Sequence, residues 1–247
     1  MKNSLRFLFI ALLSLTSANA ASTWTTGHGD IGVHYELGQM HLHMHLHSGA
    51  VVGGSALGVD TEFEPGDIIS AVTGVAQLSR PSNPSLNPTG VAAGSPIWIL
   101  PITANPALPF LGWGTEELDS GDWTGNLTFS LVDVISPSGS GYFSVYTPDG
   151  FGGLDFNMST FDGGITGADF AAQAAGTHNH RFVTFSETGL WEVQMKVSGT
   201  HALDGFKESG VESFFFQVTP EPSKALFSGI GLGAVLFRRR RPAKVEA

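Results

Sequence analysis

Four histidines alternate with apolar residues in one short stretch of the chain, and they are the residues best suited to chemistry. The stretch, residues 39–47, reads QMHLHMHLH. A period of two is typical of a β-strand with one buried face, so we expect imidazoles on one face and apolar side chains on the other. Neutral imidazole nitrogens are common ligands of transition metals. The pattern therefore predicts a metal-binding face that contains His41, His43, His45 and His47.

The segment that precedes this stretch alternates in the same way. Residues 28–36 read HGDIGVHYE, and Leu37 and Gly38 offer a two-residue turn between the segments. The hairpin closed by that turn pairs Asp30 with His45, and a slip of one residue would move every side chain to the other face. Its polar face is predicted to collect His28, Asp30, His34, Glu36, His41, His43, His45 and His47.

A second histidine pair lies far along the chain. His178 and His180 are two residues apart, so both point to the same face of a strand. A pair cannot complete four-coordinate geometry, so a site needs a second strand, and a sandwich can bring the last strands beside the hairpin. Four histidines along one strand span about 20 Å, so at most two neighbours share an ion. The predicted ligands are His28, Asp30, His43, His45, His178 and His180.

The remaining histidines and the methionines refine this prediction. His41 and His47 are left as a second weak site or as surface residues. Met40 and Met44 alternate onto the opposite face, so we expect them in the core and not in a thioether copper site. Zinc is the expected ion, with copper or manganese bound by nitrogen and oxygen as alternatives.

The composition narrows the ligand chemistry and the partners. The chain has no cysteine, which leaves histidine and carboxylate as metal ligands and excludes disulfides. Its net charge is −10, from 12 basic and 22 acidic residues. Eight of the basic residues and one acid lie in segments 1–20 and 223–247, so residues 21–222 carry net −17. Such a surface repels nucleic acid and anionic lipid, and it favours cations.

Both ends of the chain carry targeting patterns. Residues 1–20 combine Lys2 and Arg6, an apolar stretch and an Ala-Asn-Ala cleavage site, as in a secretory signal peptide. Residues 219–247 contain Pro220-Glu221-Pro222, a short apolar run and four consecutive arginines, and they resemble the PEP-CTERM sorting signal of Gram-negative bacteria. That resemblance implies a hydrophobic helix that anchors the chain in the membrane until an exosortase-type enzyme cuts it. The alternative is a plain C-terminal membrane anchor.

Residues 21–218 are predicted to form one all-β domain. Short apolar strands recur between Gly- and Pro-rich turns, a pattern typical of an antiparallel β-sandwich. We expect residues 108–117 to be an aromatic turn region in which Trp113 is free to stack on sugars. Residues 177–185 are expected to be one strand, and residues 167–175 the only helical segment outside the ends.

The order of several motifs resembles a known family. GHGDIGVHYE, SPIWILP, FLGWGTEEL, GYFSVY and THNHRFVTFSETGLWEVQMKVSG together resemble the surface-anchored domain of actinobacterial wall proteins and choice-of-anchor M proteins. The resemblance spans nearly all of residues 26–200. One departure is Phe182, where the family usually has tryptophan. The resemblance implies an immunoglobulin-like sandwich and, because some members sit beside metal-type ABC transporters, metal handling.

These patterns together predict an exported binding module, and not an enzyme, that holds a divalent transition metal. Its expected location is the cell surface or extracellular matrix of a Gram-negative-type bacterium. The alternative is a structural or adhesive protein of an exopolysaccharide matrix, whose polar face contacts a partner without metal. A third hypothesis is a metal-dependent enzyme that uses Glu36 or Asp30 as the base.

Overall fold

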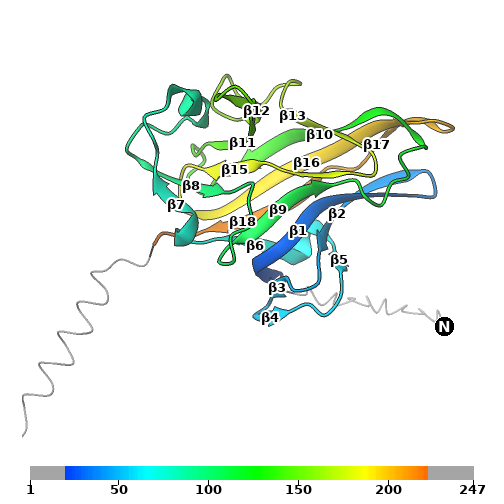
Figure 1. Cartoon of the computed structure of the whole chain (residues 1–247), viewed down its shortest axis with the longest axis horizontal. Coiled ribbons are helices and arrows are strands. Elements are labelled where there is room, and N and C mark those ends of the chain that lie inside the picture. Colours follow the sequence, from blue (N-terminus) through cyan, green and yellow to red (C-terminus); the bar gives the residue numbers. More distant parts are fainter. Residues whose placement is uncertain (1–19, 222–247) are drawn as a thin grey trace, which may run out of the picture.

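The computed structural model describes residues 20–221 (Figure 1). Residues 1–19 and 222–247, which hold the predicted signal peptide and most of the predicted sorting signal, lie outside the described residues. Among residues 20–221, no helix is long and apolar enough to cross a membrane. The helices in that range are three short 3-10 segments: η1 (Pro65–Asp67), η2 (Gly74–Ala76) and η3 (Pro84–Thr89).

The described chain folds into two packed layers of β-strands, which confirms the prediction of an all-β sandwich. One layer, here called the long sheet, has the order β13-β10-β16-β18-β6 and ends on the first residues of β1. Its strands are β6 (Ile68–Val72), β10 (Trp123–Ile135), β13 (Phe170–Ala174), β16 (Gly189–His201) and β18 (Glu212–Val218). Three short strands also belong to it: β3 (Val51–Val52), β4 (Ser55–Ala56) and β17 (Gly205–Glu208). β3 pairs with β1 and with β4, and β17 pairs with the end of β16.

The second layer consists of two separate ladders. The first, here called the histidine sheet, has the order β14-β9-β1-β2-β5. Its strands are β1 (Ser22–Glu36), β2 (Gln39–Leu46), β5 (Thr61–Phe63), β9 (Pro109–Gly114) and β14 (His178–His180). The other, the small sheet, has the order β12-β11-β15-β8-β7. Its strands are β7 (Gln77–Ser79), β8 (Pro96–Leu100), β11 (Phe143–Pro148), β12 (Leu154–Ser159) and β15 (Phe182–Phe185).

The prediction that the sandwich is antiparallel throughout is wrong. β1 runs parallel to both β6 and β9, and β18 also runs parallel to β6. Parallel neighbours cannot be joined by a tight hairpin, so the chain must travel away and return between them. Here the chain passes through β2 to β8 between β1 and β9. Figure 1 shows the result, with β9 lying along β1.

Strand β1 belongs to both layers. Its first residues pair with β6 in the long sheet, whereas residues from Gly27 onward pair with β9 and β2. The change of sheet occurs near Gly27, which has a φ of 91°, and the register to β3 shifts between Trp24 and Thr26. A side chain at Gly27 would place its Cβ 2.6 Å from the Cα of Ala50. Glycine is therefore required where β1 bends.

The predicted hairpin is confirmed in its register. Glu36 pairs with Gln39 and Asp30 with His45, as the two-residue turn requires. Leu37 and Gly38 have φ values of 51° and 82°, and a turn with two positive φ values matches the twist of paired strands. Leucine seldom adopts such a backbone conformation, and its side chain is almost fully exposed here.

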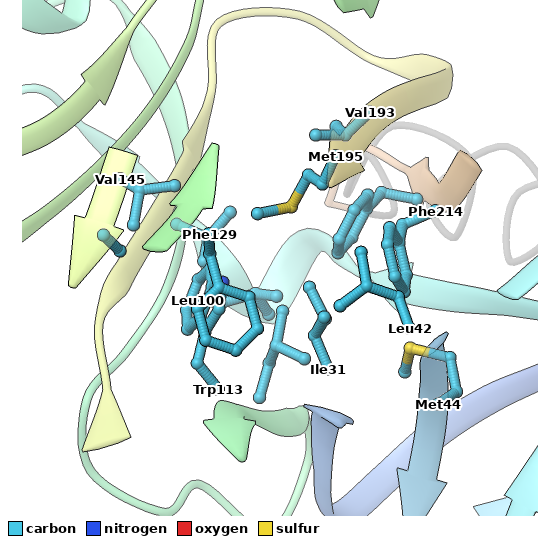
Figure 2. Close-up of a cluster of buried hydrophobic side chains, with 14 of the residues drawn as sticks. Ile31, Leu42, Met44, Leu100, Trp113, Phe129, Val145, Val193, Met195 and Phe214 are labelled. Carbon is cyan, nitrogen blue, oxygen red and sulfur yellow. The ribbon is translucent and has the colours of Figure 1, made fainter. Parts of the chain in front are cut away.

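The apolar face of the hairpin packs into the core, as predicted. Met40 and Met44 are each 3% exposed. Figure 2 shows Ile31, Leu42 and Met44 of the hairpin facing side chains of the long sheet. Burial of these side chains fixes which face of the hairpin is left for the histidines.

Two further secondary-structure predictions, one of a helix and one of a strand, are wrong. Residues 167–175 form no helix, because Phe170–Ala174 is β13, which pairs with β10 at the end of the long sheet. Residues 177–185 are not one strand but two, β14 and β15, which belong to different ladders of the same layer. Arg181 lies between them and is buried with its guanidinium 5.4 Å from the centre of the Trp113 ring.

Candidate metal centre

The polar face of the histidine sheet is arranged in rows that cross four strands. One row runs from His180 on β14 through Gly112 and Asp30 to His45 on β2. The next row, two residues away along each strand, is made of His178, Gly114, Gly32 and His43. Because residues two apart share a face, both rows display their side chains on the same surface. The distant pair on β14 therefore lies on the face of the hairpin histidines.

Glycines in β9 allow the histidines on either side of it to meet. β14 and β1 are separated by two strand spacings, about 10 Å, with β9 between them. The ring centres are nevertheless 5.1 Å apart for His28 and His180, and 5.5 Å for His28 and His178. A Cβ added at Gly112 would lie 2.0 Å from Oδ1 of Asp30 and 3.1 Å from Cε1 of His180. Any side chain at residue 112 would therefore occupy the space that these groups use.

Three imidazoles converge at this gap and form what we call the first cluster. One ring nitrogen from each of His28, His178 and His180 lies within 4.8 Å of the other two. Tetrahedral ligands at about 2.0–2.1 Å from a zinc ion are about 3.3 Å apart. The limit of 4.8 Å is wider than this spacing, so the three rings would move closer together on binding one ion.

In two of these rings, Nδ1 is held by a partner outside the cluster, and we call it the outer nitrogen. Nδ1 of His180 donates to the carbonyl oxygen of Leu111 at 2.9 Å, and Phe110 stacks on the ring with centres 3.6 Å apart. Nδ1 of His178 lies 2.5 Å from Oε1 of Glu116. Both arrangements leave Nε2 free as a ligand, and such outer contacts commonly orient histidines that bind metals.

Asp30 lies in the middle of this face and is buried, with 1% of its surface exposed. Its Oδ2 is 3.0 Å from Nε2 of His47 and 3.5 Å from Nε2 of His28. Its Oδ1 has no hydrogen-bond partner among residues 20–221. A buried carboxylate without a full set of partners is costly unless a cation or donor compensates it. Asp30 is therefore placed to interact with a cation held at the first cluster.

Burial and neighbouring charges shift the protonation of this cluster. Burial alone would raise the pKa of Asp30, but the hydrogen bonds and charges of His28 and His47 outweigh it and the pKa lies below its ordinary value. Burial would lower the pKa of His47, but Asp30 and Asp60 outweigh it and raise that pKa. Burial also lowers the pKa of His180, despite the Leu111 hydrogen bond, so this imidazole favours the neutral form that binds metal.

Three of the six predicted ligands, His28, His178 and His180, meet at the first cluster, and Asp30 lies beside it against His28 and His47. The other two, His43 and His45, turn toward Glu117. The ring nitrogens of His43 and His45 lie 2.9 and 3.1 Å from Oε1 of that glutamate. Burial would raise the pKa of Glu117, but its hydrogen bond and charge interactions with these histidines outweigh it and lower the pKa.

Sequence reasoning missed three contributors to the site. His47 is predicted to be a second weak site or a surface residue, but its ring stacks on His28 with centres 4.2 Å apart and its Nε2 contacts Asp30. The glutamates Glu116 and Glu117, just after β9, hold His178 and His43.

Strand β9 was itself mistaken for an aromatic turn. Its residues Phe110 to Gly114 alternate, with Leu111 and Trp113 buried in the core and Gly112 and Gly114 on the polar face. Trp113 is 1% exposed and is not free to stack on a sugar. Alternation of glycine with large apolar residues was the available signal for this strand.

Comparisons with protein-family models, curated proteins and solved structures found no match to this chain. The resemblance to choice-of-anchor M proteins and to PEP-CTERM signals therefore stays a prediction from the motifs. The groups that could hold a metal ion are a feature of the structure itself.

Proposed function

We propose that this chain is an exported surface binding module that coordinates a divalent transition metal at the first cluster. The observation that carries the proposal is the convergence of His28, His178 and His180 across the glycine gap of β9. Two of these rings already have their outer nitrogens occupied, as metal-binding histidines commonly do.

The donor set and the charge support a divalent cation. Three imidazoles beside an ionised carboxylate suit zinc, with copper or manganese as alternatives, and the chain has no cysteine to offer a thiolate. Asp30 or a water molecule would supply the fourth ligand. The net charge of −17 over residues 21–222 favours the approach of cations.

The proposed location depends on the two ends of the sequence. The signal peptide over residues 1–20 supports export, and the sorting pattern over residues 219–247 supports delivery to the cell surface or matrix by an exosortase-type enzyme. A module that holds metal outside the cell needs ligands that survive oxidation, and histidine and aspartate meet that requirement.

Elemental analysis of the purified full chain tests the proposal. The chain is stripped with a chelator, loaded with Zn²⁺, freed of unbound ion and analysed for bound metal. The His178→Ala, His180→Ala variant should lose metal from the first cluster, whereas His41→Ala, an exposed histidine outside the candidate groups, should not. Equal zinc content in the wild type and the double variant would refute the first cluster. Binding to exopolysaccharide that survives the chelator would favour the matrix hypothesis instead.

A further inference from the structure

A second group of ligand atoms lies on the same face, nearer the hairpin turn. It shares no residue with the first cluster, and its ligand atoms all lie within 4.8 Å of one another. The group consists of His34, His43, Glu62 and Glu117. These residues come from β1, β2, β5 and the segment after β9, so four separate parts of the chain meet there.

His43 is the buried member of this group, and both of its ring nitrogens face other potential ligands. Nε2 lies 2.9 Å from Oε1 of Glu117, and Nδ1 lies 3.4 Å from Nδ1 of His34. Two imidazole nitrogens at that separation have almost the spacing of neighbouring ligands around one tetrahedral ion, about 3.3 Å.

A glycine makes room for this group, as Gly112 does for the first cluster. Gly32 faces His43 across the hairpin, and a Cβ added there would lie 2.5 Å from Nε2 of His43. The ring of His43 therefore lies over the backbone of β1 and reaches Glu117 beyond it. A side chain at residue 32 would push the ring out of this position.

We propose that His34, His43, Glu62 and Glu117 form a second metal site for a divalent cation, separate from the first cluster. The site offers two imidazole nitrogens and two carboxylate oxygens. Carboxylates suit harder ions such as Mn²⁺ better than imidazoles do, so the second site has a higher preference for Mn²⁺ relative to Zn²⁺ than the first. The face therefore holds two ions in different ligand environments.

Metal stoichiometry in paired variants tests this assignment. The full chain is loaded with Zn²⁺, passed through a desalting column and analysed for metal per chain. We expect two equivalents of zinc per chain in the wild type. The double variant with His34→Ala and Glu117→Gln should keep one, and the double variant with His178→Ala and His180→Ala should also keep one. Asp155→Asn, an exposed acid on β12, should keep both ions. Circular dichroism and thermal unfolding confirm that each variant is folded.

The outcomes separate the two sites from each other. The wild type could instead bind one equivalent of zinc. If the double variant with His178→Ala and His180→Ala loses it and the double variant with His34→Ala and Glu117→Gln keeps it, the second site is overturned and the first is retained. One equivalent with the opposite pattern would retain the second site and overturn the first. Zinc-free protein in every case would overturn both.

A glycine variant tests the second site without removing a ligand. Gly32→Ala should weaken binding at the second site by about 10–100-fold and leave one tightly bound equivalent at the first. In the His178→Ala, His180→Ala background, the electron paramagnetic resonance signal of free Mn²⁺ should fall on addition of protein. When the added protein also carries Gly32→Ala, the signal of free Mn²⁺ should stay near its level without protein. Unchanged Mn²⁺ binding in Gly32→Ala would contradict the assignment.

Discussion

Replacing Gly112 with alanine is the sharpest test of the first cluster, because it adds one methyl group and removes no ligand. The added Cβ would lie 2.0 Å from Oδ1 of Asp30 and 3.1 Å from Cε1 of His180. An ordinary contact between carbon and oxygen is longer than 3 Å, so the carboxylate must move by about 1 Å or more. Asp30 would then lose its present position beside His47 and His28.

The fold should survive this change because the two nearest atoms are the ends of side chains, although the carbonyl oxygen of Asn179 is also only 3.3 Å away. The φ of Gly112 is not positive, so alanine adds no backbone strain. Crowding of this kind lowers the free energy of unfolding by about 1–3 kcal/mol. Displacement of a residue that supports a metal site costs about 10–100-fold in affinity, which is about 1.4–2.7 kcal/mol of binding free energy.

Calorimetric titration with Zn²⁺ measures this effect. The titration is done in the His34→Ala, Glu117→Gln background, so that only the first cluster binds. Gly167→Ala is the matched control, because a Cβ at that glycine meets open space. We expect weaker binding in Gly112→Ala and unchanged binding in Gly167→Ala. Equal affinity in both variants, with both folded, would refute the placement of Asp30 and His180 around one ion.

Three further predictions concern stability. Because the pKa of Asp30 is lowered in the folded protein, Asp30 stabilises the fold above about pH 4, and this stability is lost as pH falls through the pKa of the folded state. Because the pKa of His47 is raised, His47 stabilises the fold below about pH 6.5, and this stability is lost as pH rises through its pKa in the folded state. His47→Gln should therefore destabilise the metal-free protein more near pH 5.5 than near pH 8.5 in urea unfolding, and an equal cost at both would contradict the ion pair. Leu37→Asn should raise the free energy of unfolding by about 0.5–1 kcal/mol, because asparagine tolerates the positive φ at this position better than leucine does. A lower free energy of unfolding in denaturant titration would show instead that contacts of the leucine outweigh the backbone strain. Trp113→Ala should cost about 3–5 kcal/mol by the same measurement, because it leaves a cavity under Arg181, and a cost below 1 kcal/mol would disagree with its burial.

The hairpin could be predicted from sequence because its signals are local. Residues 28–47 carry two alternating segments and a two-residue turn, and burial of the apolar face allows only one register. Asp30 opposite His45 follows directly from that register. The same reasoning placed Met40 and Met44 in the core, where the structure has them.

The neighbours of the hairpin could not be predicted because they depend on pairings between distant segments. β9 joins β1 as a parallel strand after more than seventy intervening residues, and β14 joins β9 in turn. Only those pairings bring His178 and His180 to His28, and only they place Glu117, just after β9, beside His43. Parallel pairing leaves no turn motif in the sequence, so alternation alone could not reveal it.

The two faces of β9 have a consequence for how this chain can change over evolution. From Leu111 to Gly114 its residues alternate between a crowded interior and a surface without side chains. Leu111 and Trp113 therefore tolerate no smaller side chain, and Gly112 and Gly114 tolerate no larger one without displacing Asp30. His41 of β2, by contrast, is exposed and can be exchanged without disturbing the interior. Divergence among natural variants should therefore be tolerated at His41 before it is tolerated on β9, a strand that bears no histidine.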